Sequence, residues 1–343
     1  MKSTTSVCLV RSPVFLKHKA PPDHPECEQR LTSIYSLFDE RADLAAIPVI
    51  EPSEASLQTL LKVHNKTIVE KLFSVAGKSG YLDADTYISP DSIQTARLAA
   101  GSCIEAARSI WTGLYKRGFC LIRPPGHHAT PNEPMGFCLF NNSALAATAL
   151  LEEKPNARLA IVDFDLHHGN GTQESFYANP NVLFISSHRH PFYPGTGNMQ
   201  EVGEGPGKGA TVNLPLGKKY GDEFFLALYS QVVGPILKAY QPEMILVSAG
   251  FDGHSQDPMQ GFNLSTQAYG SIAEMLMVTA DKICEGKILF ILEGGYHPQA
   301  LKNSVELILD KMIMQELSQK PFDQSFPEIE NFRAFFQPFF QIR

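Results

Sequence analysis

The sequence lacks long apolar runs, an excess of positive charge and closely paired cysteines, and each absence excludes a class of protein. No stretch approaches the ~18 consecutive apolar residues that a membrane span needs. Residues 1–10 contain one lysine and a short apolar patch, without the cleavage site typical of a signal peptide. We therefore expect a soluble, cytoplasmic protein that does not bind a membrane.

The net charge and the spacing of the cysteines restrict the class of protein further. The formal net charge is -7, which argues against direct nucleic-acid binding because a basic face is needed to neutralise phosphates. A basic protein or a polyamine stays open as a substrate. None of the six cysteines forms a CxxC pair, so we interpret them as buried thiols in a reducing compartment.

The chain is long enough for two domains, since it has 343 residues of which 43% are hydrophobic. No linker, low-complexity tract or charge block would separate them. Our interpretation is a single domain over residues 1–343, with its motifs in a core of about 7–312. The tail from Phe322 to Arg343 is rich in Phe, Pro and Gln, and we expect it to pack on the domain rather than to contact a partner. The oligomeric state is left open.

Short apolar runs alternate with longer amphipathic segments, which indicates an α/β fold. The predicted strands are Val7–Val10, Ala46–Ile50, Gly118–Ile122, Arg158–Val162, Val182–Ser186, Met244–Ser248 and Lys287–Leu292. The last five are apolar along their whole length, as parallel strands covered on both faces are. The predicted helices are Asp91–Lys116, Asn141–Lys154, Asp222–Tyr240 and Leu264–Glu285. We expect a mostly parallel, open sheet flanked by helices on both faces, with a barrel as the alternative.

Polar or glycine-rich residues follow each of the five buried strands. In chain order these are His127 and His128, Asp163 to Asn170, Ser187 and His188, Asp252, and Glu293 to Tyr296. Because the ligand site of an open α/β sheet lies at the carboxyl ends of its strands, we expect these residues to converge at one edge.

Two of these residues, Asp165 and His167, have the spacing of metal ligands. If the chain is extended, residues two apart point the same way, and Asp252 at another strand end is the best-placed third ligand. Two carboxylates and one imidazole suit Zn²⁺ or Fe²⁺, with a fourth position open for water. An isolated Asp-x-His is more often a satisfied polar turn, but the other polar strand ends favour the metal.

The adjacent histidines suit proton transfer, because an unperturbed imidazole titrates near neutral pH. Asp163 could accept a hydrogen bond from one of them and favour its protonated form. Asn170 could orient the other without adding charge, which would leave that ring neutral. Tyr296 follows two glycines and could donate to a developing oxyanion, although a lone tyrosine is more often a packing residue.

Seven strings of the sequence together resemble the zinc-dependent histone deacetylase family, which also contains acetylpolyamine amidohydrolases and acetoin-utilisation proteins. The matching segments are 123–128, 136–142, 163–171, 193–197, 248–252, 257–259 and 292–296. They occur in the family's order between about Val7 and Met312. Asn170 and the segment 248–252 are similar to the class II branch.

The resemblance implies a role for each matching residue. Asp165, His167 and Asp252 would bind one zinc ion, His127 and His128 would transfer protons, and Tyr296 would polarise the acetyl carbonyl. The residues that would bind substrate are Phe137 and Tyr193 as tunnel walls, Gly136, Met259, Asp85 as a rim acceptor, and Arg30 near an internal acetate cavity. Tyr193 replaces the phenylalanine that is usual in the family.

The resemblance also implies structural potassium. One site would use Asp163, Asp165, His167, Ser186 and Ser187, and a second would use Phe176, Asn179 and Val182.

The implied reaction is hydrolysis of an acetyl amide to acetate and a free amine. Acetyl-lysine in a protein or peptide is the favoured substrate. An acetylpolyamine or another small acyl-amine is the alternative, and Met259 weakens it because polyamine-specific members can carry glutamate at that position. A non-catalytic acyl-lysine binding module is a third interpretation, but it predicts the loss of a ligand, histidine or tyrosine that this sequence retains.

Overall fold

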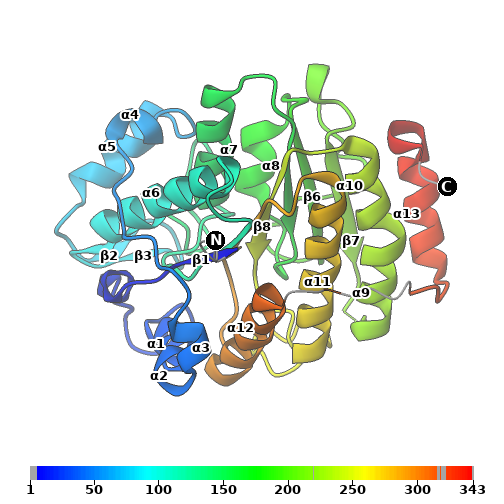
Figure 1. Ribbon diagram of the computed structural model, residues 1–343. Helices are drawn as coiled ribbons and strands as arrows, with labels where there is room; N and C mark the ends of the chain where they lie inside the picture. Colours follow the sequence, from blue (N-terminus) through cyan, green and yellow to red (C-terminus); the bar gives the residue numbers. More distant parts are fainter. Residues whose placement is uncertain (1–5, 219, 315–316, 318–321, 342–343) are drawn as a thin grey trace.

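The computed structural model describes residues 6–218, 220–314, 317 and 322–341, and its centre is a seven-stranded parallel sheet (Figure 1). The strand order is β1-β4-β9-β8-β5-β6-β7. The strands are β1 (Val7–Val10), β4 (Arg117–Cys120), β5 (Leu159–Asp163), β6 (Val182–Arg189), β7 (Thr211–Leu216), β8 (Met244–Ala249) and β9 (Ile288–Leu292). A separate two-stranded antiparallel sheet joins β2 (Gly80–Tyr81) to β3 (Tyr87–Ile88).

Helices cover both faces of this sheet. The helices are α1 (Gln29–Tyr35), α2 (Leu37–Glu40), α3 (Ala42–Ala45), α4 (Leu57–Leu60), α5 (Lys66–Ser74), α6 (Ser92–Trp111), α7 (Asn142–Glu153), α8 (Asn170–Phe176), α9 (Asp222–Leu228), α10 (Gly234–Tyr240), α11 (Thr266–Ile283), α12 (Pro298–Ile313) and α13 (Pro327–Phe340). The chain runs from β1 towards β7 through α6, α7 and α8, then returns through α9, α10 and α11. Right-handed crossovers therefore place these two groups on opposite faces, as Figure 1 shows.

The central strands are buried along their whole length, which explains why their sequences are uniformly apolar. Every residue of β5, β8 and β9 is buried. The five buried strands predicted from the sequence all occur, with boundaries that shift by up to three residues. The predicted α/β fold with a parallel, open sheet is thus confirmed, and the alternative of a barrel is wrong because β1 and β7 lie at free edges.

Two strand predictions differ from the structure. Residues 46–50 were expected to form a strand, but Val49 makes only an isolated bridge with Leu9. The short helix α3 occupies the preceding residues, and Pro48 has no N–H with which to continue a ladder. Conversely, β7 was missed because Asn213 and Pro215 interrupt its apolar pattern. Proline is tolerated there because β7 is an edge strand.

The predicted helix Asp222–Tyr240 is divided into three parts. Between α9 and α10 lies a π-helical turn, η3 (Tyr229–Val233), in which the Gly234 N–H donates to the Tyr229 carbonyl five residues earlier. Pro235, at the start of α10, cannot donate the bond that a continuous α-helix would need at that position.

The tail folds into α13, which packs against η3 and α10 (Figure 1). Ile329, Phe332 and Phe336 form its buried face, while Phe339 stays 38% exposed. The expected packing of this tail is confirmed for the part that the structure describes, which excludes residues 342–343.

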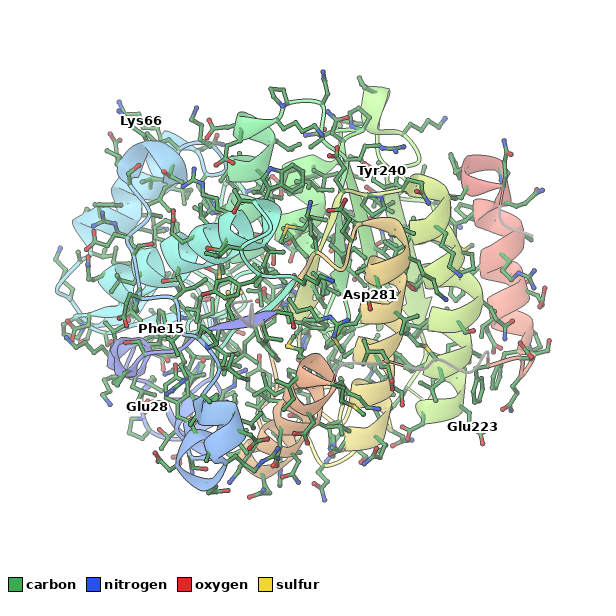
Figure 2. The ribbon with its side chains drawn as sticks, viewed as in Figure 1. Phe15, Glu28, Lys66, Glu223, Tyr240 and Asp281 are labelled. Atoms are coloured by element: carbon green, nitrogen blue, oxygen red, sulfur yellow. The ribbon has the colours of Figure 1, made fainter. Side chains whose placement is uncertain are left out.

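The outer face of the molecule is polar. Figure 2 shows Lys66 on α5 and Glu223 on α9 at the periphery of the molecule, and both are exposed. None of the described helices combines the length and the apolarity that crossing a bilayer requires. A cytoplasmic location stays a prediction.

One buried histidine outside the sheet links two loops and gives the fold a pH dependence. The imidazole of His64 is 1% exposed. Its Nδ1 donates to the Thr130 carbonyl at 2.9 Å, and its Nε2 accepts from the Asn141 N–H at 3.0 Å. Burial, opposed by the bond to Thr130, lowers the pKa of His64 to about 4.

We expect this histidine to destabilise the fold as the pH falls. In the unfolded chain its pKa is ~6.5, so the unfolded state binds the proton first. Stability is therefore lost from pH ~6.5 downwards and levels off below the folded pKa of about 4, a total of about 3 kcal/mol. Urea denaturation of wild type and His64→Gln should give a stability difference that is smaller at pH 5 than at pH 7 by about 2 kcal/mol. A difference that does not change with pH would contradict this assignment.

Candidate active site

The candidate site lies where four neighbouring strands of the sheet end. In the order β4-β9-β8-β5, these strands lead into the loops that carry His127, Tyr296, Asp252 and Asp165. The parallel register aligns their ends, with Asp163 opposite Ser248 and Ala249 opposite Leu292. Among these strands, β5 leads on to β6 on one side, whereas its neighbour β8 leads on to β9 on the other side. Open α/β sheets bind ligands where neighbouring strands are connected in opposite directions in this way.

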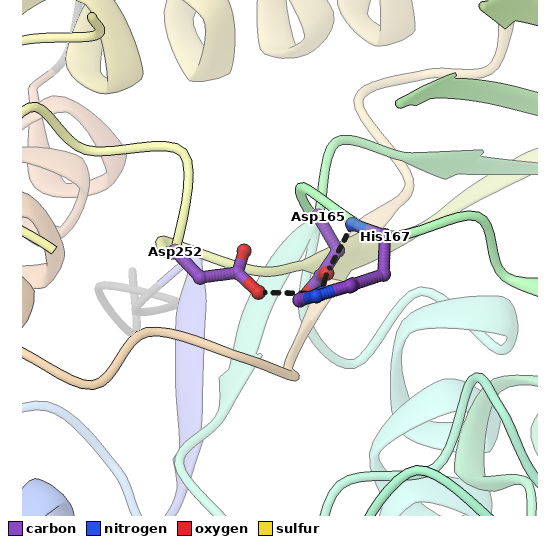
Figure 3. A group of neighbouring side chains, drawn as sticks. All are labelled: Asp165, His167 and Asp252. Atoms are coloured by element: carbon purple, nitrogen blue, oxygen red, sulfur yellow. Dashed lines mark hydrogen bonds and ion pairs between the residues drawn. The ribbon is translucent and has the colours of Figure 1, made fainter. Parts of the chain in front are cut away.

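The three predicted metal ligands lie together (Figure 3). Asp165, His167 and Asp252 are buried, and their ligand atoms lie within 4.8 Å of one another. His167 Nδ1 lies 3.1 Å from Asp165 Oδ1 and 2.9 Å from Asp252 Oδ2. The three side chains expected to converge thus lie together, and their binding of a metal ion stays a prediction.

These residues fit a divalent metal ion. Atoms that bind a tetrahedral ion at ~2.1 Å lie roughly 3.4 Å apart, close to the separations of 3.1 and 2.9 Å between His167 Nδ1 and the two carboxylates. Asp252 Oδ2 is a buried acceptor that makes no hydrogen bond of good geometry with the described residues. Two buried carboxylates side by side also need a positive charge between them. Oxygen and nitrogen donors suit Zn²⁺ or Fe²⁺.

The electrostatics of this cluster agree with that fit. Burial opposes a charge on His167, but its contacts with Asp165 and Asp252 prevail and raise its pKa to about 10. Burial, followed by the charge of Asp165, raises the pKa of Asp252. The cluster as a whole therefore attracts a cation.

The tandem histidines have different partners. His127 Nδ1 donates to Asp163 Oδ2 at 3.0 Å, whereas His128 Nδ1 donates to the neutral amide oxygen of Asn170 at 2.8 Å. Burial disfavours a charge on both rings. For His127 the carboxylates of Asp163 and Asp165 outweigh burial and raise the pKa to about 10.

For His128, burial and then the charge of His127 hold the pKa well below its ordinary value. The two ring centroids are 4.0 Å apart. The site thus contains one protonated imidazole beside one neutral imidazole whose Nε2 is available as an acceptor.

Tyr296 stands on the glycine loop after β9, with its ring edge-on to Phe137 at 5.9 Å between centroids. The guanidinium carbon of Arg30 lies 5.0 Å from the centre of the same ring. Burial and the nearby Asp252 carboxylate raise the pKa of Tyr296 well above its ordinary value. The phenol therefore stays protonated and can donate a hydrogen bond.

The aromatic ring of Tyr193 lies beside His128 on the solvent-exposed side of the site. The Tyr193 ring is 39% exposed and lies edge-on to His128, with 5.2 Å between centroids. An added Cβ at Gly136 would collide with the His128 ring. Beside Tyr193 opens a cavity of about 400 Å³, whose lining includes Asp85. Tyr193 and Asp85 thus line one cavity, whereas Gly136 packs against the His128 ring. A role of these residues in binding substrate stays a prediction.

Of the two other predicted substrate residues, Met259 lies in the loop after β8 and Arg30 lies in α1. Met259 is half-buried, and its N–H donates to Asp257 Oδ1 at 3.0 Å. Arg30 is fully buried and donates to the carbonyls of Glu293 and Gly295, at 2.5 and 2.6 Å. A role for Arg30 towards acetate stays a prediction.

Three buried acids of the site were given no role from the sequence, although Glu293 and Asp257 lie in segments that match the family. Glu26 binds both Arg30 and Arg123. Glu293 Oε2 accepts from the N–H groups of Gly126 and His127. Asp257 accepts from the Tyr296 loop. Glu26 has one partner nearby in sequence, Arg30 four residues on, and one distant partner, Arg123. The partners of Glu293 and Asp257 are backbone groups, which no local pattern marks.

The predicted potassium residues lie along β5, β6 and α8. Ser186 pairs with Asp163 across the sheet, and the Ser187 hydroxyl lies 2.9 Å from the Tyr229 hydroxyl. The Phe176 carbonyl accepts from the Asn179 N–H at 2.9 Å, while Val182 begins β6. Potassium binding at either site stays a prediction.

Comparison with known proteins identifies close relatives. A model of the histone deacetylase domain matches residues 24–312. A probable deacetylase of Archaeoglobus fulgidus is 40% identical over 284 residues, which are 82% of this chain and 79% of that protein. Histone deacetylase clr3 of Schizosaccharomyces pombe is 36% identical over 313 residues, 85% of this chain and 45% of that protein. The crystal structure of the HDA15 HD domain has a TM-score of 0.90 at 34% identity and covers 99% of this chain and 96% of that one. The chain therefore spans most of the archaeal relative but about half of the fission yeast protein.

We expect Asp252→Asn to weaken Zn²⁺ binding by more than ~100-fold, beyond the ~10–100-fold typical of an outer hydrogen-bond partner. The amide keeps the size of the side chain and its bond from the Leu166 N–H, but it removes the charge. Metal content after dialysis, measured by mass spectrometry, is the readout. Asp281→Asn is the matched control, because Asp281 pairs with Arg117 away from the site. Full metal content in Asp252→Asn would show that the ligand assignment is wrong.

Proposed function

The chain belongs to the histone deacetylase family of acetyl-amide hydrolases, and we propose that it deacetylates acetyl-lysine in proteins or peptides, releasing acetate and free lysine. The observation that carries this proposal is the convergence of Asp165, His167 and Asp252 with a histidine pair and a tyrosine. Zn²⁺ is the proposed ion, and Fe²⁺ is the alternative that the same donors accept. An ion bound there would polarise the amide carbonyl and lower the pKa of water.

His128 is the proposed general base. Its Nδ1 hydrogen is engaged by Asn170, which fixes the tautomer and leaves Nε2 able to take a proton from the attacking water. His127 carries the positive charge and is oriented by Asp163. A protonated histidine of this pair then donates a proton to the leaving amine, so that the pair gains one proton from water and gives one to the lysine nitrogen.

Tyr296 is the proposed oxyanion donor. Its pKa is raised, so its hydroxyl keeps its proton and can donate to the carbonyl oxygen as negative charge develops. Arg30 beneath the ring adds a positive charge within 5.0 Å. Phe137 and Tyr193 would enclose the alkyl chain of the acetylated side chain, and Asp85 would accept a backbone N–H at the rim. Potassium bound at the two sites around Ser186 and Asn179 is proposed as structural.

Replacing Tyr296 by phenylalanine should lower kcat by about 10²–10³, the scale of one lost oxyanion donor. KM should change little, because the donor acts mainly on charge that develops in the transition state. Steady-state kinetics on an acetyl-lysine peptide measure both constants, with metal content checked in parallel. A wild-type kcat in Tyr296→Phe would remove this residue from the mechanism.

A comparison of substrates tests the proposed substrate class. We expect kcat/KM to be higher, by at least about tenfold, for an acetyl-lysine peptide than for acetylspermidine, because Met259 supplies no carboxylate for a second ammonium. Chelation should abolish the activity, and added Zn²⁺ should restore it. A preference for acetylspermidine would point to a polyamine amidohydrolase, and binding of the peptide without turnover would point to an acyl-lysine binding module.

A further inference from the structure

The loop that carries Tyr296 contains two glycines, so its position is set by contacts rather than by the chain itself. Gly295 has a φ of 114°, which other residues rarely adopt. An added Cβ at Gly294 would lie 2.6 Å from Asp165 Oδ2 and from Asp252 Oδ2, so no side chain can anchor the loop here. The glycine segment that precedes Tyr296 can therefore be held only through backbone contacts.

Asp257 supplies such a contact on the amide side of the loop. Its Oδ2 accepts from the N–H groups of Tyr296, at 2.6 Å, and of His297, at 3.2 Å. The residue is 3% exposed. These two amides come immediately after the glycines, so one carboxylate oxygen fixes the backbone at the point where the tyrosine side chain leaves it.

The other face of the same loop binds Arg30. The guanidinium donates to the carbonyls of Glu293 and Gly295, and Glu26 orients it through a 2.9 Å ion pair. The loop is thus held between a buried cation on its carbonyl side and a buried carboxylate on its amide side. Charge-assisted hydrogen bonds of this kind are stronger than neutral ones.

Asp257 is itself fixed to the segment that contributes the third metal ligand. It lies in a turn in which its N–H donates to the His254 carbonyl at 2.9 Å, and the His254 N–H donates to Phe251 at 3.1 Å. Phe251 directly precedes Asp252. Asp257 therefore links the backbone of Tyr296 to the backbone of the loop that follows β8 through hydrogen bonds.

We propose that Asp257 is a positioning residue for the deacetylation reaction, which holds the hydroxyl of Tyr296 in register with the Asp165, His167 and Asp252 cluster. It touches no reacting atom and acts only through the tyrosine. This inference rests on the proposed function, since it assigns Asp257 a part in the same reaction.

Removal of the carboxylate should lower kcat without lowering affinity for substrate. We expect Asp257→Ala to reduce kcat about 10- to 100-fold, the scale of a catalytic group displaced by ~1 Å, with KM changed little. In the Tyr296→Phe background the same substitution should have almost no further effect, because the group that Asp257 positions is already absent. Independent, multiplied losses in the double variant would overturn the proposal.

Hydrogen exchange gives a readout that does not depend on turnover. In Asp257→Ala, the amides of Tyr296 and His297 should exchange at least about tenfold faster, because each loses its charged acceptor. Exchange at these two amides that equals wild type would also overturn the proposal. Asp257→Asn provides a second variant of the same size if the alanine variant folds poorly.

Asp222→Ala is the matched control. Asp222 also accepts from a backbone amide, that of Ser265 at 2.8 Å. Among the described residues, no hydrogen bond or ion pair joins it to the Tyr296 loop. Its removal should leave kcat and the exchange of the Tyr296 amide unchanged. If Tyr296→Phe itself leaves kcat intact, the proposed function fails; if Tyr296→Phe is impaired while Asp257→Ala matches wild type, only the role of Asp257 fails.

Discussion

Asp165 and Asp252 place two carboxylates within 3.1 Å of one nitrogen, His167 Nδ1, and all three side chains are buried. Like charges in a water-poor interior repel, and each loses its hydration, so this arrangement costs free energy unless a cation compensates it. The two carboxylates are close together because the strands that precede them, β5 and β8, are adjacent and parallel. A cation bound at this position would stabilise this edge of the sheet as well as supply the chemistry proposed for it.

The acids of the site, Asp165 and Asp252 included, accept hydrogen bonds from backbone amides. Asp165 Oδ2 accepts from the Gly294 N–H, and Asp252 Oδ1 accepts from the Leu166 N–H, both at 2.9 Å. Asp257 and Glu293 each accept from two consecutive amides of a neighbouring loop. Because each carboxylate binds the backbone of a loop from another strand, the loops are fixed relative to one another before substrate arrives, which is the condition for electrostatic preorganisation.

This pattern explains which features could be predicted from the sequence. Uniformly apolar strands were recognisable because burial on both faces dictates their composition. The candidate ligands Asp165 and His167 were recognisable because their chemistry resides in side chains at a fixed spacing. Asp257 and Glu293 were not, since their partners are amides that carry no residue identity. The edge strand β7, which contains Pro215, was not predicted, and the strand predicted around Pro48 is only an isolated bridge. Both errors arise because the local pattern does not reveal where a strand lies in the sheet.

The two tandem histidines show that such contacts can give identical residues different protonation states. They are the same residue type, adjacent in sequence and almost equally buried, at 3% and 4% exposure for His127 and His128. A charge on one ring opposes a charge on the other at 4.0 Å between centroids. Asp163, the last residue of β5, gives the charge to His127, whereas Asn170, the first residue of α8, offers His128 only a neutral oxygen. The distinction between acid and base therefore arises from the junction between one strand and one helix, seven residues apart, and not from the histidines themselves.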